Sequence, residues 1–297
     1  MNGIIIVDKP QGKTSHDIVY AIRRLTGIKK VGHTGTLDPM ATGVLPICIG
    51  SATKVADMLT LSDKAYTAEF VLGKTTDTLD AEGEILTETE VNITEDEIRA
   101  AVMSFVGEIE QIPPMYSAIK QNGKKLYELA RQGIEVERKP RKVTINSIDI
   151  LEINGKTVTI DVSCSKGTYI RTLCADIGEK LGVGAYMTKL RRTKTGMFDI
   201  SESHTLEELA NAKASHWTLK SETGTLKNVL IPIDKIFEKY PEIILNEKQK
   251  KSVTNGVRMT YKGRENQSYR VYDENKSFLC ISKIIDGKLT LEKSFWS

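Results

Sequence analysis

Residues 64–72 alternate strictly between apolar positions on one face and more polar positions on the other. This period of two is typical of a strand with one covered face. The clearest hairpin joins residues 143–153 to residues 156–164, because Asn154-Gly155 is a dipeptide that tight two-residue turns favour. Hairpins join antiparallel strands, so we expect much of the sheet to be antiparallel.

Helices are predicted where apolar residues recur every three or four positions. Thr14 or Ser15 can cap a helix whose apolar stripe stops at Gly27. Residues 52–61 are a further helix, with Met58 expected to face inward. Strands and helices follow one another without a βαβ rhythm. The sequence therefore predicts an α+β fold with a mixed, largely antiparallel sheet flanked by helices.

The chain divides into two predicted domains, residues 1–238 and 239–297. The boundary is marked by proline within apolar residues 231–233 and by Tyr240-Pro241. Beyond it, a second hairpin is predicted around Asp286-Gly287. The last ~60 residues are therefore expected to form a small, mostly β domain.

Residues 107–142 are an insertion of different composition, punctuated by glycine and proline. The whole chain carries a net charge of only +3. Between Lys120 and Lys142 there are eight basic and three acidic residues, a local charge of +5. A charged run is usually a solvated face. Here, however, Tyr116 and Tyr127 are interleaved with the basic residues, as in a mobile clamp on RNA.

The four cysteines are scattered without a Cys-x-x-Cys pair, and the histidines lack metal-ligand spacing. We interpret the cysteines as buried thiols of a reducing compartment, not as a zinc site. The N-terminal segment has Asp8 directly after its apolar residues, unlike a signal peptide. No apolar run approaches the ~20 residues of a membrane-spanning helix. We therefore expect a cytoplasmic protein without metal or membrane association.

Residues 31–46 are the segment that most invites a chemical interpretation. Their three glycines and two prolines break any helix or long strand. Asp38 is the only acid between Asp17 and Asp57, and it stands among short polar side chains. Aspartate before Pro39 often starts a turn or caps a helix. A polar loop pinned by apolar residues also presents a single reactive group, which makes Asp38 a candidate catalytic residue.

The stretch G-H-T-G-T-L-D-P-M-A-T-G-V-L-P at 32–46 resembles the catalytic motif of the TruB family, the bacterial tRNA pseudouridine-55 synthases. The match is long and has no gaps. It implies that Asp38 is the essential nucleophile and that His33 meets the T-loop of tRNA. It also implies the pseudouridine synthase fold with a C-terminal PUA-like RNA-binding domain.

Later segments resemble further motifs of this family in the same order: residues 63–66, 164–171 and 189–192. The resemblance implies that Tyr66 stacks on the target base and that Leu190 lines the base pocket. It implies that Tyr169 binds substrate and that Arg171 pairs with the nucleophile. Lys54 is expected to contact substrate as well. Taken singly, Tyr66 is typical of a core tyrosine and Arg171 of a solvated cation, so the joint match carries these assignments.

Converting uridine to pseudouridine breaks an N-glycosidic bond and rejoins the same base through carbon. It needs no redox change, so no nicotinamide, flavin or metal is expected. It needs a nucleophile that is ionised at neutral pH, and an aspartate with an ordinary pKa of ~3.9 qualifies. Arg171 would keep Asp38 charged and fix its rotamer, preferably through a bidentate pair. The sequence leaves open whether Asp38 attacks the sugar or the base.

We expect a monomeric enzyme that flips out and modifies the T-arm uridine at tRNA position 55, without a guide RNA or protein partner. One alternative is a guide-RNA-dependent synthase of archaea and eukaryotes, which shares the aspartate motif. The insertion at 107–142 argues against it, since such a segment could grip tRNA directly. The other alternative is an RNA chaperone or binding module. Asp38 and Arg171 indicate retained catalysis, which leaves help in tRNA folding as a second role.

Overall fold

The computed structural model describes residues 1–121, 123–214 and 225–296. Its largest feature is a nine-stranded sheet in the order β1-β3-β12-β4-β11-β10-β7, with β2 paired to β3 and β13 to β12. The strands are β1 (Gly3–Lys9), β2 (Val31–His33), β3 (Thr42–Ile49), β4 (Lys64–Leu72), β7 (Gly107–Gln111), β10 (Arg141–Asn154), β11 (Thr157–Cys164), β12 (Ala185–Thr195) and β13 (Phe198–Asp199). Within the described sheet the pairs are antiparallel except β12 with β3. The predicted mixed, largely antiparallel sheet is confirmed.

Strand β4 lies at the centre of the sheet, between β11 and β12. Its residues alternate between buried and half-buried along the whole strand, as the period of two predicts. The hairpin of β10 and β11 turns at Asn154-Gly155, where Gly155 has a φ of 59°. Glycine adopts this left-handed conformation without the steric cost that other residues incur, which explains the turn.

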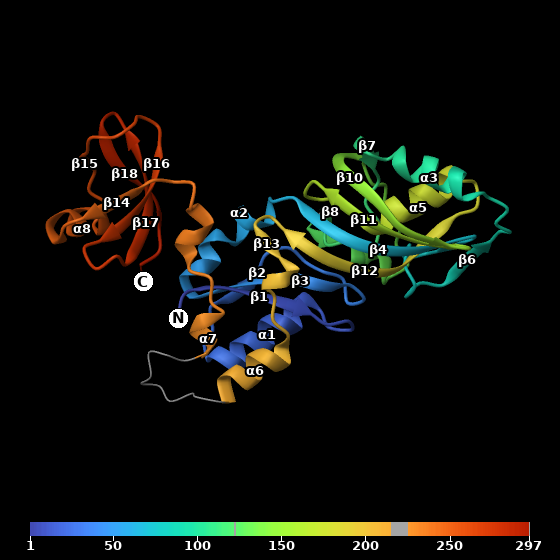
Figure 1. Ribbon diagram of the computed structural model, residues 1–297, viewed down its shortest axis with the longest axis horizontal. Coiled ribbons are helices and arrows are strands. Elements are labelled where there is room, and N and C mark those ends of the chain that lie inside the picture. Colours follow the sequence, from blue (N-terminus) through green and yellow to red (C-terminus); the bar gives the residue numbers. More distant parts are fainter. Residues whose placement is uncertain (122, 215–224, 297) are drawn as a thin grey trace.

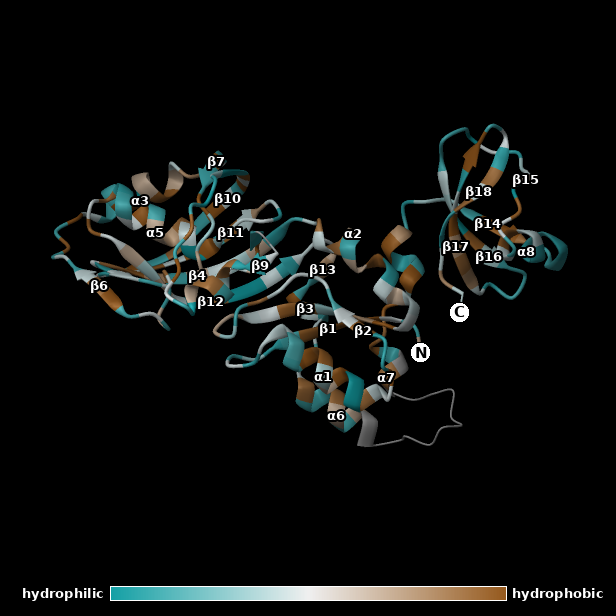
Figure 2. Cartoon of the chain, turned by 180° about the vertical axis from the view of Figure 1, so that it is seen from behind, coloured by the Kyte–Doolittle hydropathy of each residue, from teal (hydrophilic) through white to brown (hydrophobic). Residues whose placement is uncertain are grey.

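Helices flank this sheet (Figure 1). They are α1 (Ser15–Thr26), α2 (Ala56–Thr60), α3 (Glu95–Met103), α4 (Leu126–Ala130), α5 (Ile170–Lys180), α6 (Leu206–Ala214) and α7 (Thr225–Asn228). Thr14 caps α1 in a capping box with Asp17, and the helix ends at Gly27, as predicted. Figure 2 shows a mainly hydrophobic β1 beside an α1 that carries both hydrophobic and hydrophilic residues.

The helix predicted at 52–61 is partly wrong. A 3-10 helix, η1 (Gly50–Val55), occupies its first half, and α2 begins only at Ala56. Because a 3-10 turn contains about three residues instead of 3.6, the apolar stripe does not continue in phase. Met58 is therefore 42% exposed instead of facing inward.

The C-terminal part contains a separate five-stranded sheet in the order β14-β16-β17-β18-β15. Its elements are β14 (Glu242–Leu245), α8 (Glu247–Thr254), β15 (Met259–Thr260), β16 (Ser268–Asp273), β17 (Phe278–Ile285) and β18 (Lys288–Ser294). The hairpin predicted around Asp286-Gly287 joins β17 to β18. Figure 1 shows this sheet at one end of the molecule. It meets the rest of the chain through a cluster of Phe237, Phe278 and Phe295.

The segment between the two sheets, residues 200–241, pairs with strand β1 of the large sheet before it reaches the C-terminal sheet. The backbone N–H of His204 donates to the Ile6 carbonyl at 2.9 Å, and the N–H of Ile231 donates to the Ile4 carbonyl at 2.8 Å. Short 3-10 helices, η2 (Ile200–Glu202) and η3 (Ile233–Phe237), lie at its two ends. In the part of the chain that is described, no helix is long and apolar enough to span a membrane.

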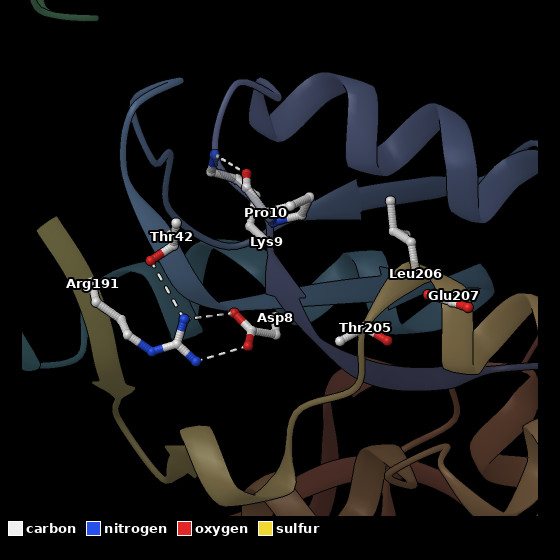
Figure 3. A pocket seen from close by; sticks show the side chains of 8 residues that line it. All are labelled: Asp8, Lys9, Pro10, Thr42, Arg191, Thr205, Leu206 and Glu207. Atoms are coloured by element: carbon white, nitrogen blue, oxygen red, sulfur yellow. Dashed lines mark hydrogen bonds and ion pairs between the residues drawn. The ribbon is translucent and has the colours of Figure 1, made fainter. Parts of the chain in front are cut away.

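The two faces of the large sheet differ in character. Cross-strand partners point to the same face, so the register places Lys9, Gly43 and Tyr66 together on the face that α1 and α5 cover. The opposite face carries Asp8 and Arg191, whose guanidinium donates to both oxygens of that carboxylate at 2.7 and 3.1 Å (Figure 3). A cavity of about 330 Å³ opens beside this ion pair.

Candidate active site

Asp38 lies in the irregular loop between β2 and β3, as the glycine- and proline-rich sequence predicts. The loop closes on itself, because the Ala41 N–H donates to the Asp38 carbonyl at 3.1 Å. The Asp38 side chain is 39% exposed, so its carboxylate remains accessible from solvent. The loop therefore presents one acid at the surface of a buried support.

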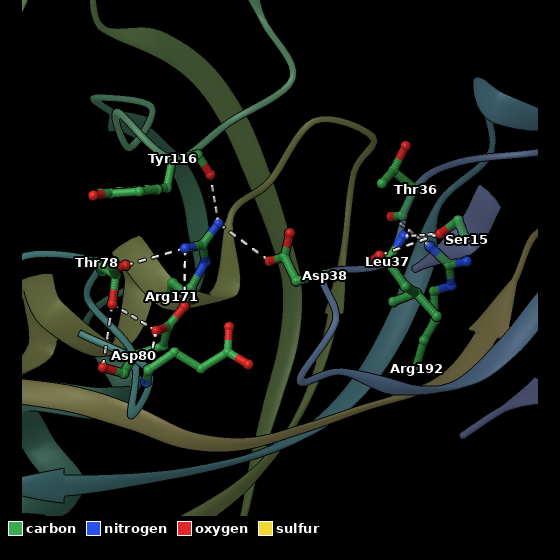
Figure 4. A network of polar contacts seen from close by, with 10 residues as sticks. Ser15, Thr36, Leu37, Asp38, Thr78, Asp80, Tyr116, Arg171 and Arg192 are labelled. Atoms are coloured by element: carbon green, nitrogen blue, oxygen red, sulfur yellow. Dashed lines mark hydrogen bonds and ion pairs between the residues drawn. The ribbon is translucent and has the colours of Figure 1, made fainter. Parts of the chain in front are cut away.

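Arg171 contacts this carboxylate from the first turn of α5 (Figure 4). Its Nη2 lies 3.1 Å from Asp38 Oδ2, and its side chain is only 5% exposed. The expected bidentate pair is absent among the described ion pairs, because Nη1 instead lies 2.9 Å from Asp80 Oδ2. One arginine thus holds two aspartates, one accessible and one buried. A fork shared in this way fixes both carboxylates relative to each other.

Asp80 is a member of this site that the sequence did not single out. Its side chain is 4% exposed, and its Oδ1 accepts from the Thr78 hydroxyl at 2.6 Å and from the Glu82 N–H at 3.1 Å. Asp80 stands in a turn that holds several acids, none distinguished by spacing. Only the fold brings this one to Arg171.

The pKa of Asp38 is raised above its ordinary value. The largest cause is desolvation, because protein atoms surround the carboxylate on most sides although part of it stays exposed. The negative charge of Asp80 adds to this effect, whereas Arg171 and Lys9 act in the opposite direction. Asp38 is therefore harder to ionise than an aspartate with an ordinary pKa. The positive charge of Arg171 favours the ionised form that a nucleophile needs.

The remaining donors of Arg171 are fixed by backbone carbonyls. Nη2 also donates to Tyr116 at 2.8 Å, and Nη1 donates to Thr78 at 3.1 Å. Tyr116 belongs to the insertion 107–142, so that segment touches the candidate catalytic arginine directly. Tyr169 precedes Arg171 at the N-cap of α5, where the Gln111 side chain accepts from its N–H at 3.0 Å. Tyr169 and Arg171 are thus presented by the same helix start.

Tyr66 and Leu190 lie on the same face of neighbouring strands, with Leu190 opposite Ala68. Both are largely buried, at 9% and 8% exposure. Burial raises the pKa of the Tyr66 phenol, and Tyr66 lies opposite Arg192 in the register of β4 and β12. The fold thus brings the two side chains together, and their role as walls of a base pocket stays a prediction.

His33 ends β2, on the chain leading into the Asp38 loop. Burial lowers its pKa, and the nearby His16 and Arg192 lower it further. Its ring lies edge-on to that of His16, with centroids 6.4 Å apart. Lys54 is placed differently from the others. Its Nζ donates to the Ser294 carbonyl of the C-terminal sheet at 3.0 Å.

This chain is similar to known pseudouridine synthases over most of its length. The family model of the TruB family pseudouridylate synthase N-terminal domain matches residues 23–170, and that of the tRNA pseudouridylate synthase B C-terminal domain matches residues 171–238. A tRNA pseudouridine synthase B of Clostridium kluyveri is 46% identical over 99% of this chain and 100% of that protein. Its namesake from Alkaliphilus oremlandii is 51% identical over 87% of this chain and 83% of that protein.

The chain belongs to the TruB family of pseudouridylate synthases. Solved structures agree with this assignment. The archaeal box H/ACA sRNP Nop10-Cbf5 complex contains a chain that superposes with a TM-score of 0.71 at 28% identity, over 99% of this chain and 86% of that one. A Cbf5-Nop10-Gar1 complex gives 0.72, also at 28% identity. The predicted pseudouridine synthase fold is confirmed.

In a TruB-family chain, the side chains gathered near Asp38 are the candidates for catalysis and for binding the base. Among the described residues no group of three or more His, Cys, Asp or Glu side chains is placed to hold a metal ion. Asp38, Arg171, Tyr66, Tyr169 and Leu190 come from distant segments, and the fold gathers them around one loop. These side chains are therefore the candidates for the chemistry of this TruB chain.

Proposed function

We propose that this chain is a tRNA pseudouridine synthase that isomerises the T-arm uridine at position 55. The observation that carries this proposal is the contact of accessible Asp38 with buried Arg171 beside Tyr66 and Leu190. It provides an oriented carboxylate beside the sheet face that carries Tyr66 and Leu190. The names of the 46–51% identical relatives support tRNA as substrate.

In the proposed reaction the C1′–N1 bond of uridine breaks and a C1′–C5 bond forms. The C5 proton leaves and N1 gains a proton, so the product is an isomer and no electrons are exchanged. Asp38 supplies the nucleophilic electron pair, either to C1′ of the sugar or to the base. The bond that it forms breaks again before the product leaves, so the carboxylate is regenerated. Arg171 orients that carboxylate and favours its ionised form.

The uridine must leave the stack before it reacts, which costs a few kcal/mol. Tyr66 would stack on the flipped base, and Leu190 would line the base pocket. Tyr169 and His33 would hold the neighbouring nucleotides of the loop. The Lys54 ammonium group, which already donates to Ser294, would donate a further hydrogen bond to a phosphate.

The insertion 107–142 is proposed to grip the RNA. Lys125 Nζ and the Arg131 guanidinium lie 5.3 and 5.5 Å from the Tyr127 ring centroid, so one aromatic side chain gathers two cations. We assign residues 1–238 to catalysis and 239–297 to a PUA-like RNA-binding domain. With its own grip, the chain would act as a cytoplasmic monomer without guide RNA or protein partner. Help in tRNA folding would be a second role.

The decisive experiment maps pseudouridine in unmodified tRNA after incubation with the purified chain alone. We expect a single modified position, uridine 55. Modification only after addition of a guide RNA would instead support the function of a guided synthase. Tight tRNA binding without modification would support a binding module.

Replacing Lys124, Lys125 and Arg131 with glutamine tests the grip. The dependence of log K on log salt should flatten by ~0.7–0.9 for every phosphate that the variant no longer neutralises. We therefore expect weaker tRNA binding, most visibly at low salt, measured by fluorescence titration. The exposed Lys156 in the β10–β11 turn is a control, and Lys156→Gln should keep the wild-type slope. An unchanged slope in the triple variant would mean that its residues are simply solvated.

Truncation after Lys239 tests the division into two domains. Every proposed catalytic residue remains, so slow modification should persist, although Phe237 no longer packs against Phe278 and Phe295. We expect weaker binding of full-length tRNA and little change for an isolated T-arm stem-loop. Complete inactivity of a soluble, folded truncation would show that the boundary or the division of labour is wrong.

A further inference from the structure

Arg192 is a buried cation beneath the Asp38 loop. Its side chain is 1% exposed, and no ion pair found within the described residues includes it. The guanidinium donates instead to backbone carbonyls: to Val44 at 2.7 Å, to Gly35 at 3.2 Å and to Thr36 at 3.4 Å. A buried charge is costly, and an apolar side chain of similar size often stabilises a fold equally well. Stability alone therefore does not explain an arginine here.

The sheet register explains how this side chain reaches the loop. Lys9, Gly43, Arg192 and Tyr66 form one cross-strand row through β1, β3, β12 and β4. A Cβ on Gly43 would collide with the Arg192 carbonyl oxygen, and Gly43 has a φ of 100°. Only glycine permits this close approach of the two strands. The row thus brings Arg192 directly under the loop.

Side chains from this row and from α1 form hydrogen bonds with the backbone of residues 35–39, on both sides of Asp38 (Figure 4). Arg192 holds the carbonyls of residues 35 and 36. The Ser15 hydroxyl accepts from the Leu37 N–H at 2.9 Å and donates to its carbonyl at 3.2 Å. Lys9 Nζ donates to the Pro39 carbonyl at 3.2 Å. The backbone is therefore fixed on both sides of Asp38, while the Asp38 carboxylate stays accessible.

Arg192 has a second neighbour, Tyr66, because the register places these two residues opposite each other on β12 and β4, with both side chains on the same face. It is thus hydrogen-bonded to the loop of the nucleophile and adjacent to the tyrosine assigned to the base. We infer that Arg192 is a positioning residue that sets the distance between Asp38 and Tyr66, and hence between the nucleophile and the flipped base. This inference rests on the proposed function. It differs from the role of Arg171, which acts on the carboxylate itself.

The test compares Arg192→Lys with wild type in the full chain. The enzyme is present at saturating concentration and in excess over tRNA, so each tRNA reacts once. Lysine keeps the charge but lacks the planar fork that holds the carbonyls of Val44, Gly35 and Thr36 together. Since a misplacement of 1 Å can cost ~100-fold, we expect the single-turnover rate to fall ~10–100-fold. The tRNA Kd should stay within about twofold, because phosphate contacts determine affinity. The acid limb of the pH–rate profile should not move, since the charge at residue 192 is preserved.

Arg191→Lys is the matched control. Arg191 is the preceding residue of β12, but it pairs with Asp8 on the opposite face of the sheet. We expect its single-turnover rate to remain near that of wild type. A near-wild-type rate for Arg192→Lys would overturn the inference. So would a fall in rate matched by an equal loss of tRNA affinity and of thermal stability, because that pattern indicates a purely structural role.

Ser15→Ala keeps the test open if Arg192→Lys does not fold. It removes the hold on Leu37 and leaves the Thr14 cap of α1 in place. We expect a several-fold slower single-turnover rate with unchanged tRNA affinity; an unchanged rate would overturn the inference. A wild-type chain that forms no pseudouridine in tRNA would refute the proposed function itself, whereas the inference is judged only with active wild type.

Discussion

Replacing Asp38 with asparagine should reduce pseudouridine formation to background while tRNA binding changes by no more than a few-fold. Asparagine keeps the size and much of the hydrogen bonding of aspartate but removes the charge that makes it a nucleophile. The interaction with Arg171 at 3.1 Å would no longer be ionic, and no cavity would form. The measurement is a single-turnover assay on transcribed tRNA, with binding determined separately.

The control for this variant is Asp57→Asn. Asp57 is an exposed aspartate on α2, and its substitution removes the same charge from the chain. We expect its rate to match wild type. Substantial pseudouridine formation by Asp38→Asn would end the assignment of Asp38 as nucleophile.

The second large effect concerns Arg171, where orientation and charge are separable. Lysine supplies a charge but not the planar fork that reaches Asp38, Asp80 and two carbonyls together. We expect Arg171→Lys to lower the single-turnover rate at least ~100-fold with tRNA affinity little changed. A near-wild-type rate would demote Arg171 to a general positive charge.

The pH dependence distinguishes the two roles further. Burial raises the pKa of Asp38 and Arg171 lowers it, so removing the positive charge should raise it more. A carboxylate with a raised pKa becomes protonated, and therefore inactive, at a higher pH. In Arg171→Gln the acid limb of the rate profile should move to higher pH, whereas in Arg171→Lys it should stay near its wild-type position.

Asp80→Asn completes this series. It frees one arm of the Arg171 fork while leaving the Asp38 contact possible, and it removes a charge that raises the pKa of Asp38. We expect a slower reaction, because the fork is less well fixed, together with an acid limb at lower pH. An acid limb that moves to higher pH instead would contradict the conclusion that the charge of Asp80 raises the pKa of Asp38.

The sequence by itself determined the local structure and the candidate residues. The alternation of β4, the caps of α1 and the glycine turns of both hairpins depend on near neighbours, which a linear sequence displays. The run of Gly and Pro around Asp38 likewise identified a loop. Periodicity failed at Met58, where a 3-10 turn put the helix out of phase.

The family resemblance already implied that Arg171 pairs with Asp38, but only the tertiary structure decided which further groups meet at this pair. Asp80 and Arg171 are 91 residues apart, and Arg192 reaches the loop because strands β3 and β12 pair side by side. Such contacts depend on sheet order and register, which have no periodic trace in the sequence. The same holds for the pKa of Asp38, because desolvation exists only once the chain has folded around the carboxylate.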